Sequence, residues 1–178
     1  MAKSLVTKGY KVKGTTTSKE KLETLSNVGI APFRVHLSEY EIQGDIMEFL
    51  NGTDTLVVNI PPKLRGQGTK ENYVRKIELL AANISTSAVR EVLFVSSTSV
   101  YGDGQGEVDE ETLPVPTSEG GKQLLKTEKL LRENPHFRTT ILRFAGLIGP
   151  DRHPIHMLSG RTNLSGGNAP VNLINLED

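Results

Sequence analysis

EVLFVSSTSVYG, residues 91–102, runs from an apolar strand directly into a cluster of hydroxyl side chains. The first half consists of strand-forming residues and suits a buried parallel strand. Ser96, Ser97, Thr98 and Ser99 follow at the carboxyl end, which is where open α/β sheets bind ligands. The stretch predicts a strand that delivers polar groups to a site, and a serine-rich turn without function is the alternative.

Strands and helices alternate along most of the chain. Segments rich in Gly or Pro fall on the connections between them, at 61–68, 102–106 and 114–121. The alternation predicts an α/β fold with a Rossmann-like, doubly wound parallel sheet and flanking helices. The expected strands are 10–17, 33–37, 54–60, 91–97 and 138–144, and the expected helices are 19–27, 45–50, 69–87 and 121–133.

Further motifs follow the opening stretch in a consistent order. Acidic residues at 109–111 precede a Pro-Ser helix start at 114–118, and Leu-Arg-Phe at 142–144 leads to Gly-Pro at 149–150. Together with Ser-Ser-x-x-Val-Tyr-Gly, this order resembles the extended short-chain dehydrogenases/reductases of the NAD(P)-dependent epimerase/dehydratase family. The resemblance covers most of the chain and implies a dinucleotide cofactor and a small-molecule substrate.

The catalytic motif of that family is incomplete here. Family members carry Ser-x-Tyr-x-x-x-Lys at the start of the helix after the Pro-Ser loop, and a Glu four residues after the Lys. Alignment on Ser118 and Glu128 places Gly120 at the Tyr position and Leu124 at the Lys position. Glycine supplies no acid and leucine no charge, so the proton transfer of the family lacks its usual groups. Ser97 matches the family hydroxyl that binds the substrate carbonyl, and it is the candidate catalytic residue.

Neighbouring residues do not restore the missing pair. Lys122 and Lys126 are displaced by two residues, which turns a side chain by about 200° around a helix, and we expect both on a solvated face. Tyr101 is expected to close the turn after the strand, as in the family. The acidic residues 109–111 offer a carboxylate base, with a charged surface loop as the plainer alternative.

A Ser without its Tyr and Lys resembles the atypical branch of the superfamily. The implied function is an NAD(P)-binding, epimerase/dehydratase-like protein with a degenerate active site and weak or unusual oxidoreductase or epimerase chemistry. A non-catalytic NADP-binding sensor or regulatory module is the alternative, so whether the chain is an enzyme stays open at this point. A structural fragment without cofactor affinity is a third interpretation.

Both ends of the chain depart from the family pattern. No Gly-rich first strand is found, and residues 2–8, followed by Gly9 as C-cap, are typical of the end of a helix. The last residues, 172–178, resemble a strand and a helix start. We expect residues 1–148 to form an NAD(P)-binding domain without its first strand, and 149–178 to begin a substrate-binding loop or lobe. Truncation is the expected cause, with a short variant of rearranged strands as the alternative.

Candidate cofactor contacts lie at the carboxyl ends of the strands. After the strand at 10–17 come hydroxyls and a lysine, without the acidic side chain that binds a ribose 2′-hydroxyl. This favours NADP over NAD, although Ser18 is also a candidate helix N-cap. Residues at the ends of three later strands complete the set. The candidate cofactor-binding residues are Thr17, Ser18, Lys19, Asn59, Ile60, Pro61, Ser96, Ala145 and Gly146.

Thr98, Arg143, His153 and His156 are the candidate substrate residues. For Arg143, an ion pair with a loop carboxylate such as Glu110 is an equal alternative. The two histidines do not predict a metal site, because zinc needs three or four ligands and no cysteine or evident third ligand is near. A loop or substrate-pocket role is expected for them, with a replacement general acid as one option.

The amino-acid composition limits which partners and metal sites this chain can have. The 178 residues contain 21 Lys and Arg against 21 Asp and Glu, so the formal net charge is zero and no basic field attracts nucleic acid or anionic membranes. There is no cysteine, which excludes disulfides and thiolate metal sites. Without a long apolar run or signal peptide, we expect a cytoplasmic protein without a membrane partner, and a homodimer is a candidate assembly.

Overall fold

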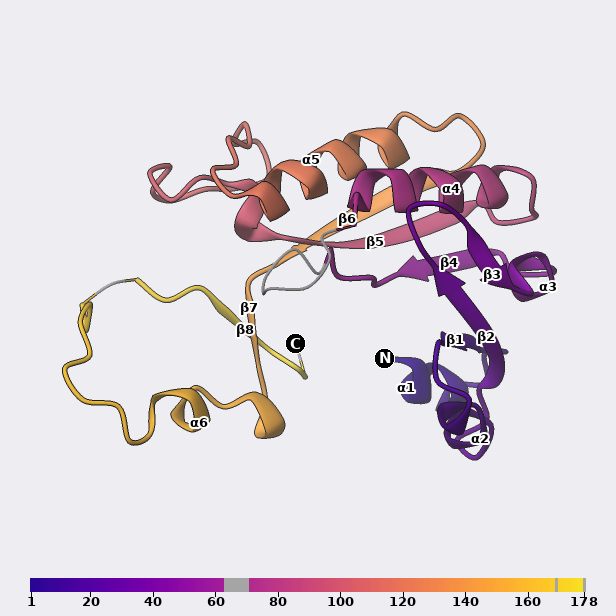
Figure 1. Ribbon diagram of the computed structural model, residues 1–178, viewed down its shortest axis with the longest axis horizontal. Coiled ribbons are helices and arrows are strands. Elements are labelled where there is room, and N and C mark those ends of the chain that lie inside the picture. Colours follow the sequence, from indigo (N-terminus) through magenta and orange to yellow (C-terminus); the bar gives the residue numbers. More distant parts are fainter. Residues whose placement is uncertain (63–70, 169, 178) are drawn as a thin grey trace.

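The structure is a computed structural model that describes residues 1–62, 71–168 and 170–177. Its main body is built from parallel strands connected by helices (Figure 1). The α/β, Rossmann-like class predicted from the alternation of elements is confirmed. No helix within these three ranges is long and apolar enough to cross a membrane.

The sheet that carries the opening stretch contains β4 (Thr55–Val58), β5 (Glu91–Ser97) and β6 (Arg138–Phe144), which are parallel and lie in the order β4-β5-β6. Both β5 and β6 begin and end where the sequence predicts. Along β5, buried and half-buried residues alternate, with Val92 and Phe94 fully buried. Since successive side chains of a strand point to opposite faces, one face of this strand is covered more completely than the other.

Two helices lie side by side on one face of this sheet, α4 (Tyr73–Ser85) and α5 (Glu119–Arg132) (Figure 1). Each begins at a capping residue: the side-chain oxygens of Asn72 and Ser118 accept bonds of 3.0 and 3.1 Å from amides of the first turn. The helices bury apolar stripes between themselves and the sheet, and this burial is what stabilises them.

A second sheet is formed by the first part of the chain. It contains β1 (Lys13–Thr16), β2 (Ala31–Leu37) and β3 (Ile42–Gly44), of which β1 and β2 are parallel and β3 is antiparallel to β2. The connection from β1 to β2 is α2 (Glu20–Ser26), and α1 (Ala2–Thr7) precedes β1. The sequence did not predict β3.

The end of α1 has the predicted geometry. Lys8 is the C-cap, and Gly9 follows with a φ of 85°, the left-handed conformation that glycine adopts without steric cost. This turn reverses the chain toward β1.

The expected single sheet is divided into these two parts. In the described ranges, β1 pairs only with β2 and β4 pairs only with β5, so both are edge strands. The core nevertheless joins the parts, because Val35 and Leu56 belong to one hydrophobic cluster with residues of α3 (Ile46–Leu50). Lys13 adds a polar tie: its Nζ donates to carbonyls at the end of α3, at 2.6 Å from the oxygen of Asn51.

The C-terminal part of the chain forms an arm that extends from the end of β6 away from both sheets (Figure 1). It contains β7 (Gly146–Ile148), η2 (Pro150–Arg152), α6 (Ile155–Leu158) and β8 (Leu173–Asn175), and β7 pairs in parallel with β8. The part expected to begin a substrate-binding loop or lobe, 149–178, therefore includes two short helices in its described residues.

Two predicted segments are only partly described. Most of the Gly- and Pro-rich segment 61–68 and the first two residues of the predicted helix 69–87 lie outside the described residues. A short helix that the sequence did not predict, η1 (Thr98–Val100), directly follows β5.

Candidate functional site

The candidate site lies at the carboxyl ends of β5 and β6. Register pairs Ser96 with Arg143 and Ser97 with Phe144. Because neighbouring residues of a strand face opposite sides, Ser96 is buried beneath α5 whereas Ser97 is half-buried on the other face. The two serines therefore have different environments.

Ser96 anchors the strand to α5. Its Oγ donates a 2.6 Å hydrogen bond to Oε1 of Glu128, which is 1% exposed. The hydroxyl is thus occupied inside the protein. A cofactor contact made by Ser96 would come from its backbone.

Arg143 completes this buried network. Its Nη2 lies 2.7 Å from Glu128 Oε2, its Nε donates to both carboxylate oxygens, and its Nη1 donates to Tyr101 Oη at 2.6 Å. The hydrogen bonding that Arg143 donates to the Glu128 carboxylate is the main reason that the pKa of Arg143 is raised. The expectation of an ion pair was right in kind but wrong in partner, since the carboxylate is Glu128 and Glu110 is not bonded to Arg143 among the described residues.

Tyr101 closes the turn after β5, as the sequence predicts. Its phenol donates to the carbonyl of Asp109 at 2.9 Å, and its ring lies 5.1 Å from the Arg143 guanidinium carbon. The Asp109 carboxylate accepts bonds from the hydroxyl and amide of Thr112, and these bonds lower its pKa. Asp109 therefore shapes a surface turn, which agrees with the plainer of its two interpretations.

The Ser97 hydroxyl is available to a ligand. Its Oγ accepts a 3.1 Å bond from the amide of Ser99 and so caps η1. No acceptor for its own O–H is found among the residues described, so it can donate to a ligand oxygen. The next residue, Thr98, is half-buried at the start of η1.

The start of α5 approaches η1 very closely. A side chain at Gly121 would place its Cβ 2.1 Å from the carbonyl oxygen of Ser99, so only glycine fits. At Gly120 a Cβ would meet no atom within 4 Å. Leu124 is 5% exposed and belongs to the hydrophobic core. The position matched to the family Tyr thus carries a glycine beside open space, and the position matched to the Lys carries an apolar core residue.

Lys122 and Lys126 are both exposed on the outer face of α5. The prediction that they occupy a solvated helix face is confirmed.

The candidate residues after β1 form a separate polar group. Thr17 and Lys19 are exposed, and the Ser18 hydroxyl donates to the carboxylate of Glu20. The prediction that Ser18 caps the helix is wrong, because α2 begins after Lys19 and has no side-chain cap. The short side chain of Ser18 is instead held by Glu20, whose pKa that bond lowers.

Arg34 is a residue that the sequence reasoning missed. It is exposed on β2, its register partner is Thr16 at the end of β1, and its charge also contributes to the lowered pKa of Glu20. A strand arginine gives no local signal, because only the pairing of β1 with β2 brings it to this place.

At the end of β4, Asn59 and Pro61 are exposed and Ile60 is half-buried. The Ile60 carbonyl accepts a 2.7 Å bond from the phenol of Tyr73, and burial raises the pKa of that phenol. Tyr73 Oη thus fixes the exit of the strand. Its amide is held by Gln123 of α5, at 2.8 Å.

Ala145 and Gly146 follow β6 at the base of the arm. The amide of Gly146 donates to the carbonyl of Asn172 at 3.1 Å, and a Cβ at Gly146 would lie 2.9 Å from Leu173 Cδ2. Gly146 therefore lies in close contact with β8.

The two histidines belong to the arm, His153 just before α6 and His156 within it, and Figure 1 shows α6 away from β5 and β6. His153 and His156 are exposed with ring centroids 6.4 Å apart, and His153 Nδ1 accepts a bond from the amide of Ile155. The described part of the chain contains no group of three residues that could hold a metal ion. The structure does not bring these histidines to Ser97.

Parallel strands joined by helices, with hydroxyls at the carboxyl ends, define a Rossmann-like α/β protein. The model of the NAD dependent epimerase/dehydratase family matches residues 1–164. The chain belongs to this family.

Among curated relatives, protein YeeZ of Escherichia coli (strain K12) is 35% identical over 179 residues, which cover 100% of this chain and 65% of YeeZ. The uncharacterized UDP-glucose epimerase YtcB of Bacillus subtilis (strain 168) is 26% identical over 151 residues, 79% of this chain and 48% of YtcB. The chain thus spans about two thirds or less of the length of these relatives.

Solved structures show the same fold. A functionally unknown conserved protein from Silicibacter pomeroyi superposes with a TM-score of 0.70 at 25% identity, over 99% of this chain and 59% of that one. UDP-glucuronic acid 4-epimerase from Bacillus cereus, in complex with NAD, superposes with a TM-score of 0.65 at 22% identity, over 86% and 54% of the two chains.

Proposed function

We propose that this chain is an NAD(P)-binding protein of the epimerase/dehydratase type whose active site is degenerate. One observation carries the proposal: on α5, the position matched to the family Tyr is Gly120 and the position matched to the Lys is Leu124, which is packed in the core. Ser97 is the triad residue that remains, with an O–H free to donate.

The residues after β1 fit a dinucleotide. Hydroxyls of Thr17 and Ser18 and the charges of Lys19 and Arg34 lie at or beside the carboxyl end of β1, which would receive the adenosine ribose. Three of these side chains are exposed, and the positive charges suit a 2′-phosphate, so NADP is proposed over NAD. Glu20 opposes this choice, but its carboxylate is already bonded to Ser18 and influenced by Arg34.

The end of β4 fits the next part of such a ligand. Asn59 and Pro61 are exposed, while the Ile60 carbonyl is used by Tyr73. Contacts there would come from the Asn59 side chain and the backbone on either side of Ile60. Bound NAD(P) would supply a hydride acceptor or donor.

The protein's own contribution to a reaction would be limited. Ser97 can donate a hydrogen bond to a carbonyl or hydroxyl oxygen of a small-molecule substrate and hold it in place. No proton donor comes from Gly120 or Leu124, and Arg143 is held by Glu128 and Tyr101. Turnover of ordinary substrates is therefore expected to be slow.

A non-catalytic NADP-binding sensor or regulatory module is the second candidate. The burial of Leu124 favours the sensor, because this apolar residue at the Lys position packs in the core and does not face a ligand. Hydride transfer distinguishes the two candidates.

The test is hydride transfer with NADP and the nucleotide sugars UDP-glucose and UDP-glucuronic acid, followed by the absorbance of reduced nicotinamide. Under the enzyme proposal, Ser97→Ala abolishes slow turnover and leaves cofactor affinity within about twofold. Ser99→Ala is the matched control, since this neighbouring hydroxyl forms no side-chain hydrogen bond among the described residues. Turnover that survives Ser97→Ala contradicts the role of Ser97. Cofactor binding without any turnover supports the sensor.

A further inference from the structure

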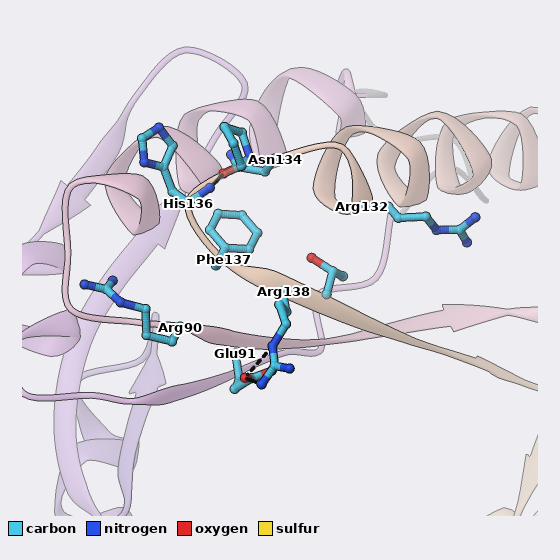
Figure 2. A pocket seen from close by; sticks show the side chains of 9 residues that line it. Arg90, Glu91, Arg132, Asn134, His136, Phe137 and Arg138 are labelled. Atoms are coloured by element: carbon cyan, nitrogen blue, oxygen red, sulfur yellow. Dashed lines mark hydrogen bonds and ion pairs between the residues drawn. The ribbon is translucent and has the colours of Figure 1, made fainter.

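A shallow depression of about 640 Å³ lies at the amino ends of β5 and β6, at the opposite end of the sheet from Ser97 (Figure 2). Its lining comes from the turn before β5, the last turn of α5 and the connection from α5 to β6. Phe137 is buried at this place. None of the residues assigned to the cofactor or substrate lines it.

Positive charge is concentrated around this depression. Arg90, Arg132 and Arg138 line it together with a single carboxylate, that of Glu91. Glu91 accepts from Arg138 Nε at 2.9 Å, so its charge is matched by one arginine. Arg90 and Arg132 remain without a carboxylate partner in the described part of the chain. The accumulation is local, because the whole chain has a formal net charge of zero.

The free guanidinium groups are available as donors. Arg90 Nη1 donates to the carbonyls of Ser87 and Val89 at 3.3 and 3.1 Å, which holds this side chain and leaves its other N–H groups free. The Arg132 side chain forms no hydrogen bond within the described ranges, and it is exposed. Guanidinium groups of this kind bind carboxylates through paired N–H donors.

The connection from α5 to β6 is held in a defined shape. Asn134 Oδ1 accepts the amide of His136 at 2.9 Å, and Asn134 Nδ2 donates to Ser85 Oγ at 3.1 Å. His136 is exposed on this connection and can add a further donor or charge. The surface is therefore preformed, which reduces the entropy that binding would cost.

The spacing of the arginines indicates the kind of partner. Figure 2 shows Arg90 and Arg132 on opposite sides of the depression, with Phe137 and the pair of Arg138 and Glu91 between them. Groups so arranged do not converge on one small anion. An extended chain with carboxylates spaced along it can meet them in turn, and arginine is enriched at such interfaces.

We propose that this surface, defined by Arg90, Arg132, His136 and Arg138, binds an acidic segment of a partner protein. Three features oppose an acidic ligand here: the Glu91 carboxylate, the carbonyls at the end of α5, and the exposed carboxylate of Glu133, which is paired with Lys129 at 3.8 Å. Arg138 offsets the first, and Arg132, in the last turn of α5, offsets the second. The proposal is independent of the cofactor and of Ser97.

The test uses an octaglutamate peptide as probe, titrated into the full chain while amide and arginine side-chain NMR signals are recorded. Binding should shift the signals of Arg90 and Arg132, and each of Arg90→Gln and Arg132→Gln should weaken affinity about threefold to tenfold. Arg161→Gln, which removes the same charge from an exposed site in the arm, should leave affinity unchanged. Added salt should weaken binding, because exposed charges are screened.

Several outcomes overturn the proposal. They are the absence of binding, an equal loss of affinity in Arg161→Gln, and a single-stranded oligonucleotide that binds this surface more tightly than the peptide. Concentration-dependent self-association that Arg132→Gln removes would also overturn it, because the occupant would then be a second copy of this chain. Both arginines are exposed, so the variants should fold, and circular dichroism verifies this.

Discussion

Arg143 Nη2 lies 2.7 Å from Glu128 Oε2, and this pair joins β6 to α5 beneath the candidate site. Glu128 also accepts from Ser96 Oγ, and Arg143 also donates to Tyr101 Oη. A single buried carboxylate therefore connects two strands, a helix and the turn after β5. The geometry of the Ser97 end of the sheet depends on it.

Loss of Glu128 should destabilise the fold strongly. Glu128→Ala leaves Arg143, whose side chain is only 18% exposed, without its counter-charge, and the expected cost is about 3–5 kcal/mol in the free energy of unfolding. Urea denaturation measures this. Glu133→Ala is the control: its exposed pair with Lys129, at 3.8 Å, should contribute less than about 1 kcal/mol. Equal effects of the two variants would contradict the structural role of Glu128.

Alanine substitutions at two adjacent glycines should change the free energy of unfolding in opposite directions. Gly121→Ala forces a Cβ against the Ser99 carbonyl and should destabilise the protein by about 1–3 kcal/mol. Gly120→Ala meets open space within a helix and should stabilise it by up to about 1 kcal/mol. Thermal and urea unfolding of both variants test this. A Gly121→Ala variant as stable as the unmodified protein would contradict the close approach of α5 to η1.

The turn at Asp109 should contribute to the acid sensitivity of the fold. Hydrogen bonds from Thr112 lower the pKa of Asp109 in the folded state, so its contribution is present above the unfolded pKa and is lost as pH falls through the folded value. Asp109→Asn should therefore reduce the loss of stability that occurs as pH falls below about 5. Glu110→Gln, at an exposed neighbour, should leave that loss unchanged. An unaltered pH profile for Asp109→Asn would contradict this assignment.

Cofactor preference should depend on the charge after β1. Lys19→Glu should weaken NADP binding about tenfold and NAD binding less than about twofold, because only NADP carries a 2′-phosphate. Lys126→Glu, on the exposed face of α5, makes the same charge change away from this site and serves as control. Equal losses for NADP and NAD in Lys19→Glu would argue against the proposed 2′-phosphate contact.

The sequence predicted local features well. The bounds of β5 follow from an apolar run that ends in hydroxyl residues, and those of β6 from a run of Thr, Ile, Leu and Phe that favours a strand. Gly9 has the left-handed conformation expected at the end of a helix, one residue after the C-cap Lys8. Lys122 and Lys126 are exposed because helical periodicity alone places them away from the buried stripe.

Features that depend on pairing between distant segments were missed. β3 exists through three register pairs with β2, and β7 through its pairs with β8, so neither β3 nor β7 has a strong local pattern. β8 itself lies within 172–178, where the sequence indicates a strand. For Arg143, an ion pair with a loop carboxylate such as Glu110 was one of two alternatives, whereas its partner is Glu128 of α5. The signal for Glu128 was present in α5, where a carboxylate stands in the buried stripe between Leu124 and Leu131. A charge in such a place needs a partner.

The most direct test of the account is calorimetric titration of NADP into the chain, with NAD in parallel. If the chain binds NAD(P) as proposed, the dissociation constant should be in the micromolar range, a binding free energy of about −8 kcal/mol, with NADP the tighter ligand. A chain that is folded by circular dichroism and gives no binding heat with either dinucleotide at several temperatures would contradict the claim that this is an NAD(P)-binding protein.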